Sequence, residues 1–119
     1  MVADATVSML EQLGHTVLAA ASGALALDAL RSEPDIDLVI TDHAMPGMTG
    51  LELAALIRES KPGLPVVLAT GYAELPDGQD IGLPRLDKPF RLDALASTLS
   101  ALLQNEAMPR HRAVRAASA

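Results

Sequence analysis

The stretch D-L-V-I-T-D-H-A-M-P-G-M-T-G-L-E-L, residues 37–53, carries the clearest structural signal in this 119-residue chain. Ile36–Thr41 is rich in β-branched residues and is followed directly by Asp42, which is typical of a buried strand. A loop containing Pro46 comes next, and the spacing of apolar residues over Leu51–Ser60 predicts an amphipathic helix. A strand, a loop and a helix in this order indicate an α/β unit.

The same alternation continues on both sides of this stretch. Further strands are predicted over Thr16–Ala20, Pro65–Thr70 and Leu83–Asp87, and further helices before Gly14 and over Ser22–Arg31 and Arg91–Leu103. Gly71–Gly82 should hold a helix, but it contains a proline and several glycines and is a poor helix former. Strands that are apolar throughout and separated by helices predict a parallel sheet covered on both faces.

Composition limits the class of protein. Half of the residues are hydrophobic but only 2% are aromatic, so the core must consist of aliphatic side chains, Met and Ala. The absence of cysteine excludes a disulfide scaffold and thiolate metal sites. No apolar run approaches the roughly 18 residues of a membrane span, and the start lacks a signal-peptide pattern. We therefore expect one soluble, cytoplasmic domain.

Charge is distributed unevenly along the chain. The net charge is −6, of which residues 105–119 contribute 3 − 1 = +2, so the first 104 residues carry −8. An acidic body argues against nucleic-acid binding, because phosphate neutralisation requires clustered Lys and Arg. Residues 105–119, rich in Arg and Ala without an apolar period, are predicted to be a flexible tail, with a weak basic contact arm as the alternative.

Three polar residues stand at or just beyond the ends of predicted strands: Asp42, Thr70 and Lys88. In parallel sheets the carboxyl ends of the strands share one edge, so these side chains should converge on one crevice. An aspartate there can attack a phosphoryl group and form an aspartyl-phosphate. A hydroxyl such as that of Thr70 can donate to the phosphoryl oxygens, and the ammonium of Lys88 can offset their charge.

The run D-L-V-I-T-D-H-A-M-P-G-M-T-G-L-E-L, then P-V-V-L-A-T-G-Y, then D-K-P-F, closely resembles the receiver domain of two-component response regulators over about residues 1–104. The resemblance implies a flavodoxin-like, doubly wound parallel sheet with strand order 2-1-3-4-5. It makes Asp42 the phosphoacceptor, Thr70 the hydroxyl that follows the phosphoryl group, and Lys88 the lysine of the K-P-F motif. It also implies that Asp42 and the backbone carbonyl of Ala44 bind Mg²⁺, and that the Lys88–Pro89 bond is a candidate cis peptide.

One departure concerns the start of the chain. The family's first strand, which lies at the centre of the sheet, and the acidic pair that ends it are absent from this sequence. Three explanations stay open: a chain that begins at an internal methionine of a longer protein, completion by a partner or swapped segment, or different strand pairing with homodimerisation. Because the acidic pair holds Mg²⁺ in the family, we expect Mg²⁺ binding to be weak or absent and phosphate uptake to be poor.

Two smaller departures concern the switch region. Arg85 occupies the position where many receivers place a Tyr or Phe that moves inward on activation. The L-A-T-G-Y run, followed by a poor helix, is similar to receivers named for an F-A-T-G-U-Y motif and to receivers fused to hybrid histidine kinases. Tyr72 is interpreted as a loop residue.

The leading functional hypothesis is a phosphorelay module that receives phosphate on Asp42 from a histidine kinase or phosphotransfer domain and switches a protein-interaction surface. It would be a single-domain regulator or the carboxyl-terminal receiver of a hybrid kinase, and not an enzyme in its own right. The alternative is a non-phosphorylated interaction module that has lost its metal site. An aspartate-based phosphohydrolase is disfavoured, because such enzymes usually carry a second carboxylate where this chain has Ala44.

Overall fold

Helices and strands alternate from α1 to β3 and again from β4 to β5, and the strand pairings among the described residues are parallel. The computed structural model describes residues 5–33, 35–43, 45, 47–70, 84–87, 90–102 and 112–117. The described strands are β1 (Thr16–Ala20), β2 (Leu38–Asp42), β3 (Val66–Thr70), β4 (Arg85–Asp87) and β5 (Arg112–Ala116). The described helices are α1 (Ala5–Gln12), α2 (Gly23–Ser32), α3 (Gly50–Ser60) and α4 (Leu92–Leu102).

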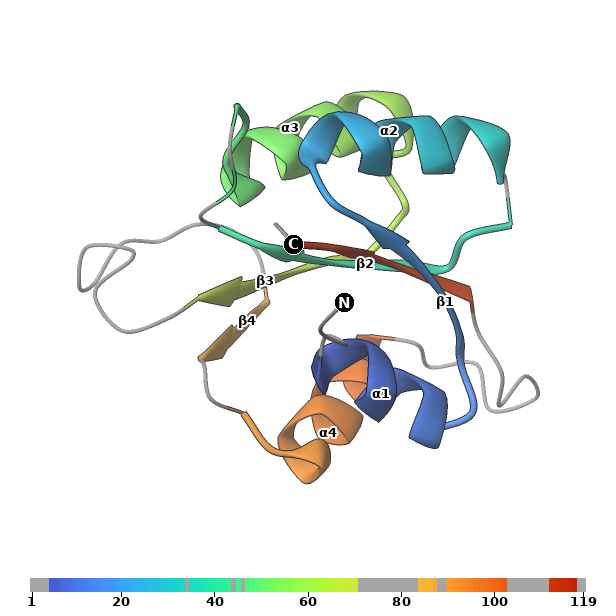
Figure 1. The fold of residues 1–119 in the computed structure, drawn as a ribbon, viewed down its shortest axis with the longest axis vertical. Helices are drawn as coiled ribbons and strands as arrows, with labels where there is room; N and C mark the ends of the chain where they lie inside the picture. Colours follow the sequence, from blue (N-terminus) through green and yellow to red (C-terminus); the bar gives the residue numbers. More distant parts are fainter. Residues whose placement is uncertain are drawn as a thin grey trace.

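The sheet lies between two helical layers, with α2 and α3 on one face and α1 and α4 on the other (Figure 1). Side chains alternate between these faces along each strand. Val39 and Val114 pack toward α2 and α3, whereas Ile40 and Ala113 pack toward α1 and α4. The predicted α/β architecture is therefore confirmed, and the doubly wound arrangement leaves the strand ends as the places where polar side chains can gather.

Side-chain caps fix where two of the helices begin. The Ser22 hydroxyl accepts a hydrogen bond from the Leu25 N–H over 3.1 Å at the start of α2. At the start of α3, Thr49 and Glu52 form a capping box, in which each side chain accepts from the other residue's backbone N–H. The second cap fixes the start of α3, which follows the loop after β2.

The centre of the sheet differs from the sequence prediction. Its strand order is β1-β5-β2-β3-β4, so β5, from the end of the chain, lies between β1 and β2. The sequence predicts that the central strand is missing and that residues 105–119 form a flexible tail. Arg112–Ala116 instead occupies the place that the family's first strand takes in its 2-1-3-4-5 order.

Backbone pairing and charge explain this position of β5. A gap between β1 and β2 would leave two rows of buried N–H and C=O groups without partners, which is costly. At the start of β5, the Arg112 N–H donates to Asp37 Oδ2 over 2.9 Å, and its guanidinium forms an ion pair with Glu33. The basic tail thus pairs with the acidic body, and no partner or swapped segment is needed to complete the sheet.

Several predictions fall on residues outside those described. They concern the poor helix at Gly71–Gly82 with Tyr72, the carbonyl of Ala44, and the Lys88–Pro89 bond. Within the described ranges, no helix is both long enough and apolar enough to cross a membrane.

Candidate functional site

Asp42 is the last residue of β2 and lies at the carboxyl edge of the sheet. Ile40 and Leu38, two and four positions earlier, pack in the cluster under α1 and α4, so alternation places Asp42 on that same face. Its side chain is 13% exposed. The sequence therefore positions one carboxylate at the carboxyl end of a buried strand, where its side chain is partly exposed to solvent.

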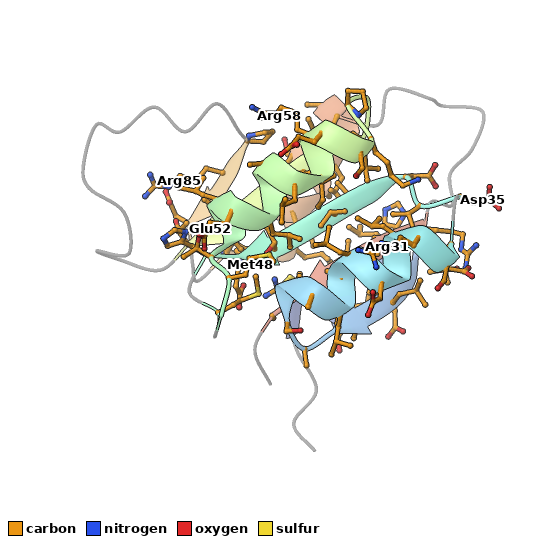
Figure 2. All side chains as sticks on the ribbon, turned by 90° about the horizontal axis from the view of Figure 1, so that it is seen from above. Arg31, Asp35, Met48, Glu52, Arg58 and Arg85 are labelled. Carbon is orange, nitrogen blue, oxygen red and sulfur yellow. The ribbon has the colours of Figure 1, made fainter. Side chains whose placement is uncertain are left out.

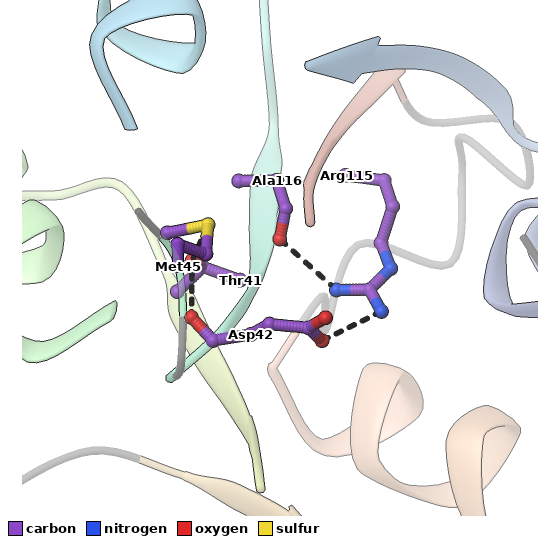
Figure 3. Close-up of polar contacts among 5 residues, drawn as sticks. All are labelled: Thr41, Asp42, Met45, Arg115 and Ala116. Atoms are coloured by element: carbon purple, nitrogen blue, oxygen red, sulfur yellow. Dashed lines mark hydrogen bonds and ion pairs between the residues drawn. The ribbon is translucent and has the colours of Figure 1, made fainter. Parts of the chain in front are cut away.

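Arg115 on the neighbouring strand β5 points at this carboxylate (Figure 3). Its Nη2 donates to Asp42 Oδ1 over 2.7 Å, and its Nη1 donates to the carbonyl of Ala116 over 3.2 Å. The Arg115 side chain is only 4% exposed. A contact this short between a buried guanidinium and a carboxylate is a charge-assisted hydrogen bond, which is about twice as strong as a neutral one.

The backbone around Asp42 is held from several sides. The Thr41 hydroxyl donates to the Asp42 carbonyl over 2.9 Å and contacts the Met45 sulfur at 3.9 Å (Figure 3). The Gly50 N–H donates to the His43 carbonyl over 2.9 Å, which ties the start of α3 to the end of β2. The carboxylate of Asp42 therefore projects from a fixed backbone.

Thr70 ends β3, the strand next to β2, and is completely buried. Asp42 pairs with Ala69 in the sheet register, so Thr70 lies one position further along and on the opposite face. Its hydroxyl accepts a hydrogen bond from Arg85 Nε over 3.2 Å, and the same Nε lies 3.0 Å from Asp87 Oδ1. Figure 2 shows Arg85 at the edge of the sheet that β4 forms.

The structure thus brings two of the three predicted site residues to one edge of the sheet, on adjacent strands. The third, Lys88, directly follows Asp87 at the end of β4 but lies outside the described residues. The predicted roles of all three remain predictions. Arg85, at the position where the resemblance leads us to expect an aromatic residue, donates a hydrogen bond to Thr70.

The described residues do not suit the Mg²⁺ that the resemblance implies. Mg²⁺ requires several oxygen ligands, and it is usually bound through carboxylates. In the described part of the chain, no group of three or more His, Asp or Glu residues could hold a metal. The guanidinium of Arg115 already contacts the Asp42 carboxylate, and its positive charge opposes a second cation there.

Sequence reasoning missed Arg115. The tail lacks the apolar run of a buried strand, and Arg and Ala favour helices more than strands. The signals available were the charge contrast between body and tail and the absence of a central strand. Together they indicate that something must fill the centre of the sheet, without showing that the chain's own end does so.

Comparisons with known proteins agree with this geometry. The family model of the response regulator receiver domain matches residues 1–100. The chain is 37% identical over 101 residues to the response regulator receiver protein CpdR of Brucella abortus, covering 82% of this chain and 83% of that protein. It is 35% identical over 107 residues to the sensor kinase CckA of the same organism, covering 84% of this chain but only 11% of that much longer protein.

A solved structure shares the fold as well. The response regulator protein TrrA of Thermotoga maritima, in a complex with Mg²⁺ and BeF, superposes with a TM-score of 0.73 at 31% identity, covering 82% of this chain and 86% of that one. The family match over most of the chain, the parallel α/β sheet and an aspartate at the end of its second strand point the same way. The chain belongs to the response regulator receiver domain family.

Proposed function

We propose that this chain is a phosphoacceptor module of a two-component phosphorelay, in which Asp42 receives a phosphoryl group from a histidine kinase or a phosphotransfer domain. The observation that carries the proposal is the position of Asp42. It is a partly exposed carboxylate at the carboxyl end of a buried parallel strand, where ligand sites of doubly wound sheets lie.

The chemistry is a phosphoryl transfer to a carboxylate. An oxygen of Asp42 forms a bond to phosphorus while the phosphorus–nitrogen bond of the donor's phosphohistidine breaks. The imidazole nitrogen keeps the electron pair of that bond, and the histidine leaves neutral because its ring carries a proton on the other nitrogen or takes one up from solvent. The product is a mixed anhydride on Asp42, an acyl phosphate.

Thr70 and Lys88 are proposed to sense and stabilise this product. The Thr70 hydroxyl now accepts from Arg85, so its own hydrogen is available for donation to a phosphoryl oxygen if the side chain turns. Such a turn would break the contact with Arg85 and carry the change to the exposed end of β4. Lys88 directly follows Asp87 in the sequence, and its ammonium would offset the added charge.

Intact mass measurement tests the proposal. The chain is incubated with a small phosphodonor, acetyl phosphate or phosphoramidate, with and without Mg²⁺, and the mass of one added phosphoryl group is expected. The Asp42→Asn variant should gain none. Asp37→Asn removes a carboxylate just before the opposite end of β2, keeps an oxygen that can accept from the Arg112 N–H, and should be labelled like the unaltered chain. Labelling that persists in Asp42→Asn would contradict the assignment.

One observation favours a second candidate, a receiver-like interaction module that is never phosphorylated. Asp42 is already paired with a buried arginine, as in a purely structural ion pair. This candidate predicts that no phosphodonor modifies Asp42 and that Asp42→Asn changes stability only. The same mass measurement separates the two functions.

A further inference from the structure

We infer that Arg115 is the resident cation of the Asp42 site, so that Asp42 accepts its phosphoryl group without a divalent metal. This inference rests on the proposed phosphoacceptor function. The contact that carries it joins Arg115 Nη2 to Asp42 Oδ1 over 2.7 Å, at the centre of the sheet's carboxyl edge.

Strand pairing on both sides of β5 fixes the backbone position of Arg115. β5 pairs with β1 on one side and with β2 on the other, where Arg115 lies opposite Ile40. Ala113 packs in the cluster under α1 and α4, so alternation places Arg115 on the face that also carries Asp42. Arg115 is only 3% exposed, so its charge is shielded from water beside the Asp42 carboxylate.

The chemistry of guanidinium suits this role. It stays protonated, and it presents five N–H donors in a planar fork that fits carboxylate and phosphate oxygens. Because Arg115 contacts Asp42 Oδ1, its positive charge lies beside the oxygen that would bond to an incoming phosphoryl group. A divalent ion would have to approach the same carboxylate against that positive charge, in surroundings where charges are weakly screened.

The charge change on phosphorylation also favours a resident cation. The single negative charge of the carboxylate is replaced by the larger negative charge of a phosphoryl group. The bond between phosphorus and the donor's leaving group breaks, and the leaving group departs with that electron pair. Arg115 offsets the added charge from the start of the step. This inference differs from the expectation of poor phosphate uptake drawn from the missing acidic pair, and the phosphorylation test below decides between them.

The first test compares phosphorylation with and without metal. The full chain is treated with phosphoramidate in excess EDTA or in Mg²⁺, and the rate of adduct formation is measured by intact mass. The two rates should agree within about twofold. Arg115→Gln should slow the reaction in EDTA by at least about tenfold, and Arg115→Lys, which keeps the charge, should recover part of the loss.

Arg112→Gln is the matched control, because it removes the same charge from the same strand at the end remote from Asp42. It should leave the rate in EDTA unchanged. Circular dichroism verifies that each variant is folded. If Arg115→Gln fails to fold, the rates of the unaltered chain in EDTA and in Mg²⁺ still decide whether phosphorylation of Asp42 needs a divalent metal.

The second test measures metal binding directly and needs no phosphorylation. Mn²⁺ is titrated into the unaltered chain, and paramagnetic broadening of amide signals in two-dimensional NMR spectra is followed. Asp42 and its neighbours should stay sharp to millimolar Mn²⁺. Arg115→Glu places a second carboxylate beside Asp42 and should produce broadening confined to the carboxyl edge of the sheet.

The outcomes separate this inference from the proposed function. An adduct that forms only with Mg²⁺, or broadening at Asp42 in the unaltered chain, overturns the role of Arg115 and leaves the phosphoacceptor function standing. Equal rates for Arg115→Gln and the unaltered chain overturn it too. If no adduct forms in any condition, the proposed function fails and metal-free phosphorylation fails with it, while the Mn²⁺ titration decides alone whether Arg115 excludes metal.

Discussion

At the scale of single residues, Gly50 shows how tightly the backbone around Asp42 is packed. It is the first residue of α3 and donates its N–H to the carbonyl of His43. A Cβ at Gly50 would lie 2.3 Å from the Asp42 carbonyl oxygen and 2.6 Å from Leu68 Cδ1. The absence of a side chain at this position lets the helix begin directly against the site strand.

Gly50→Ala should therefore destabilise the protein although alanine favours helices. The clash is with backbone, which cannot move aside cheaply, so we expect a loss of about 1–3 kcal/mol in the free energy of unfolding. Urea denaturation followed by circular dichroism measures it. Gly63→Ala is the control, because nothing lies within 4 Å of its Cβ position. A Gly50→Ala variant as stable as the control would show that α3 can shift away from Asp42.

The two contacts of Arg85 Nε should differ in energetic weight. Thr70 is completely buried, whereas the Asp87 side chain is 79% exposed. Asp87→Asn should change the free energy of unfolding by less than about 0.5 kcal/mol, because exposed ion pairs contribute little. Arg85→Ala removes the donor to a buried hydroxyl and should cost about 1 kcal/mol. Urea denaturation of both variants tests this order, and a larger effect of Asp87→Asn would reverse it.

At the scale of helices and strands, local chemistry accounts for most of what the sequence predicts. The strand over Thr16–Ala20 is found at the predicted residues, and the helix predicted over Leu51–Ser60 begins one residue earlier, at Gly50. These elements have strong local signals, namely apolar strand runs and a helix cap. β5 has none: its R-A-V-R-A sequence forms a strand because β1 and β2 offer unpaired edges on both sides.

The candidate site, too, could be predicted from the sequence only in part. Asp42 could be predicted because it ends a strand with an unmistakable apolar pattern, and its motif could be matched. Its partner Arg115 is 73 residues away in the chain and belongs to a strand that only tertiary pairing creates. Periodicity and motif spacing predict only structure formed by residues close in sequence, so they cannot predict the ion pair between Asp42 and Arg115.

The capping box of α3 supports the loop that follows Asp42, and its loss should be measurable. Thr49→Ala removes the hydroxyl that accepts from the Glu52 N–H over 3.2 Å. We expect a loss of about 1 kcal/mol in the free energy of unfolding. Ser60→Ala, at the other end of the same helix, removes only two long hydroxyl contacts with the carbonyls of Leu56 and Ile57 and should cost a few tenths of a kcal/mol at most. Equal effects in urea denaturation would show that the cap contributes nothing beyond any surface hydroxyl.

At the scale of the whole molecule, the end of the chain and the acidic body depend on each other. The body carries −8 and residues 105–119 carry +2, and both arginines of β5 form ion pairs with acidic residues of the body. Those pairs lie at opposite ends of β5, near its first and its fourth residue. Charge therefore helps to hold the central strand in register, in addition to the backbone hydrogen bonds on its two sides.

A chain shortened after residue 111 should consequently lose its native sheet, and a peptide should restore it. Without β5, the buried edges of β1 and β2 are unpaired, so we expect the sharp urea transition of the full chain to disappear. Adding a synthetic peptide of residues 110–119 should bring back that transition and the slow hydrogen exchange of the β2 amides. Because the peptide carries the basic residues, its affinity should fall on the order of tenfold between about 0.1 and 1 M salt, as the Debye length shortens from about 10 to 3 Å.

Two control peptides identify what the complementation depends on. A peptide of the same composition in scrambled order should not restore the sheet, because it cannot place small side chains and an arginine at the right positions of β5. A peptide carrying Arg115→Gln should bind more weakly than one carrying Arg112→Gln, since Arg115 is buried against Asp42 whereas the Arg112 and Glu33 side chains are each 36% exposed. If the shortened chain keeps its cooperative transition and ignores every peptide, the central strand is dispensable, and Arg115 is not needed to hold the sheet together around Asp42.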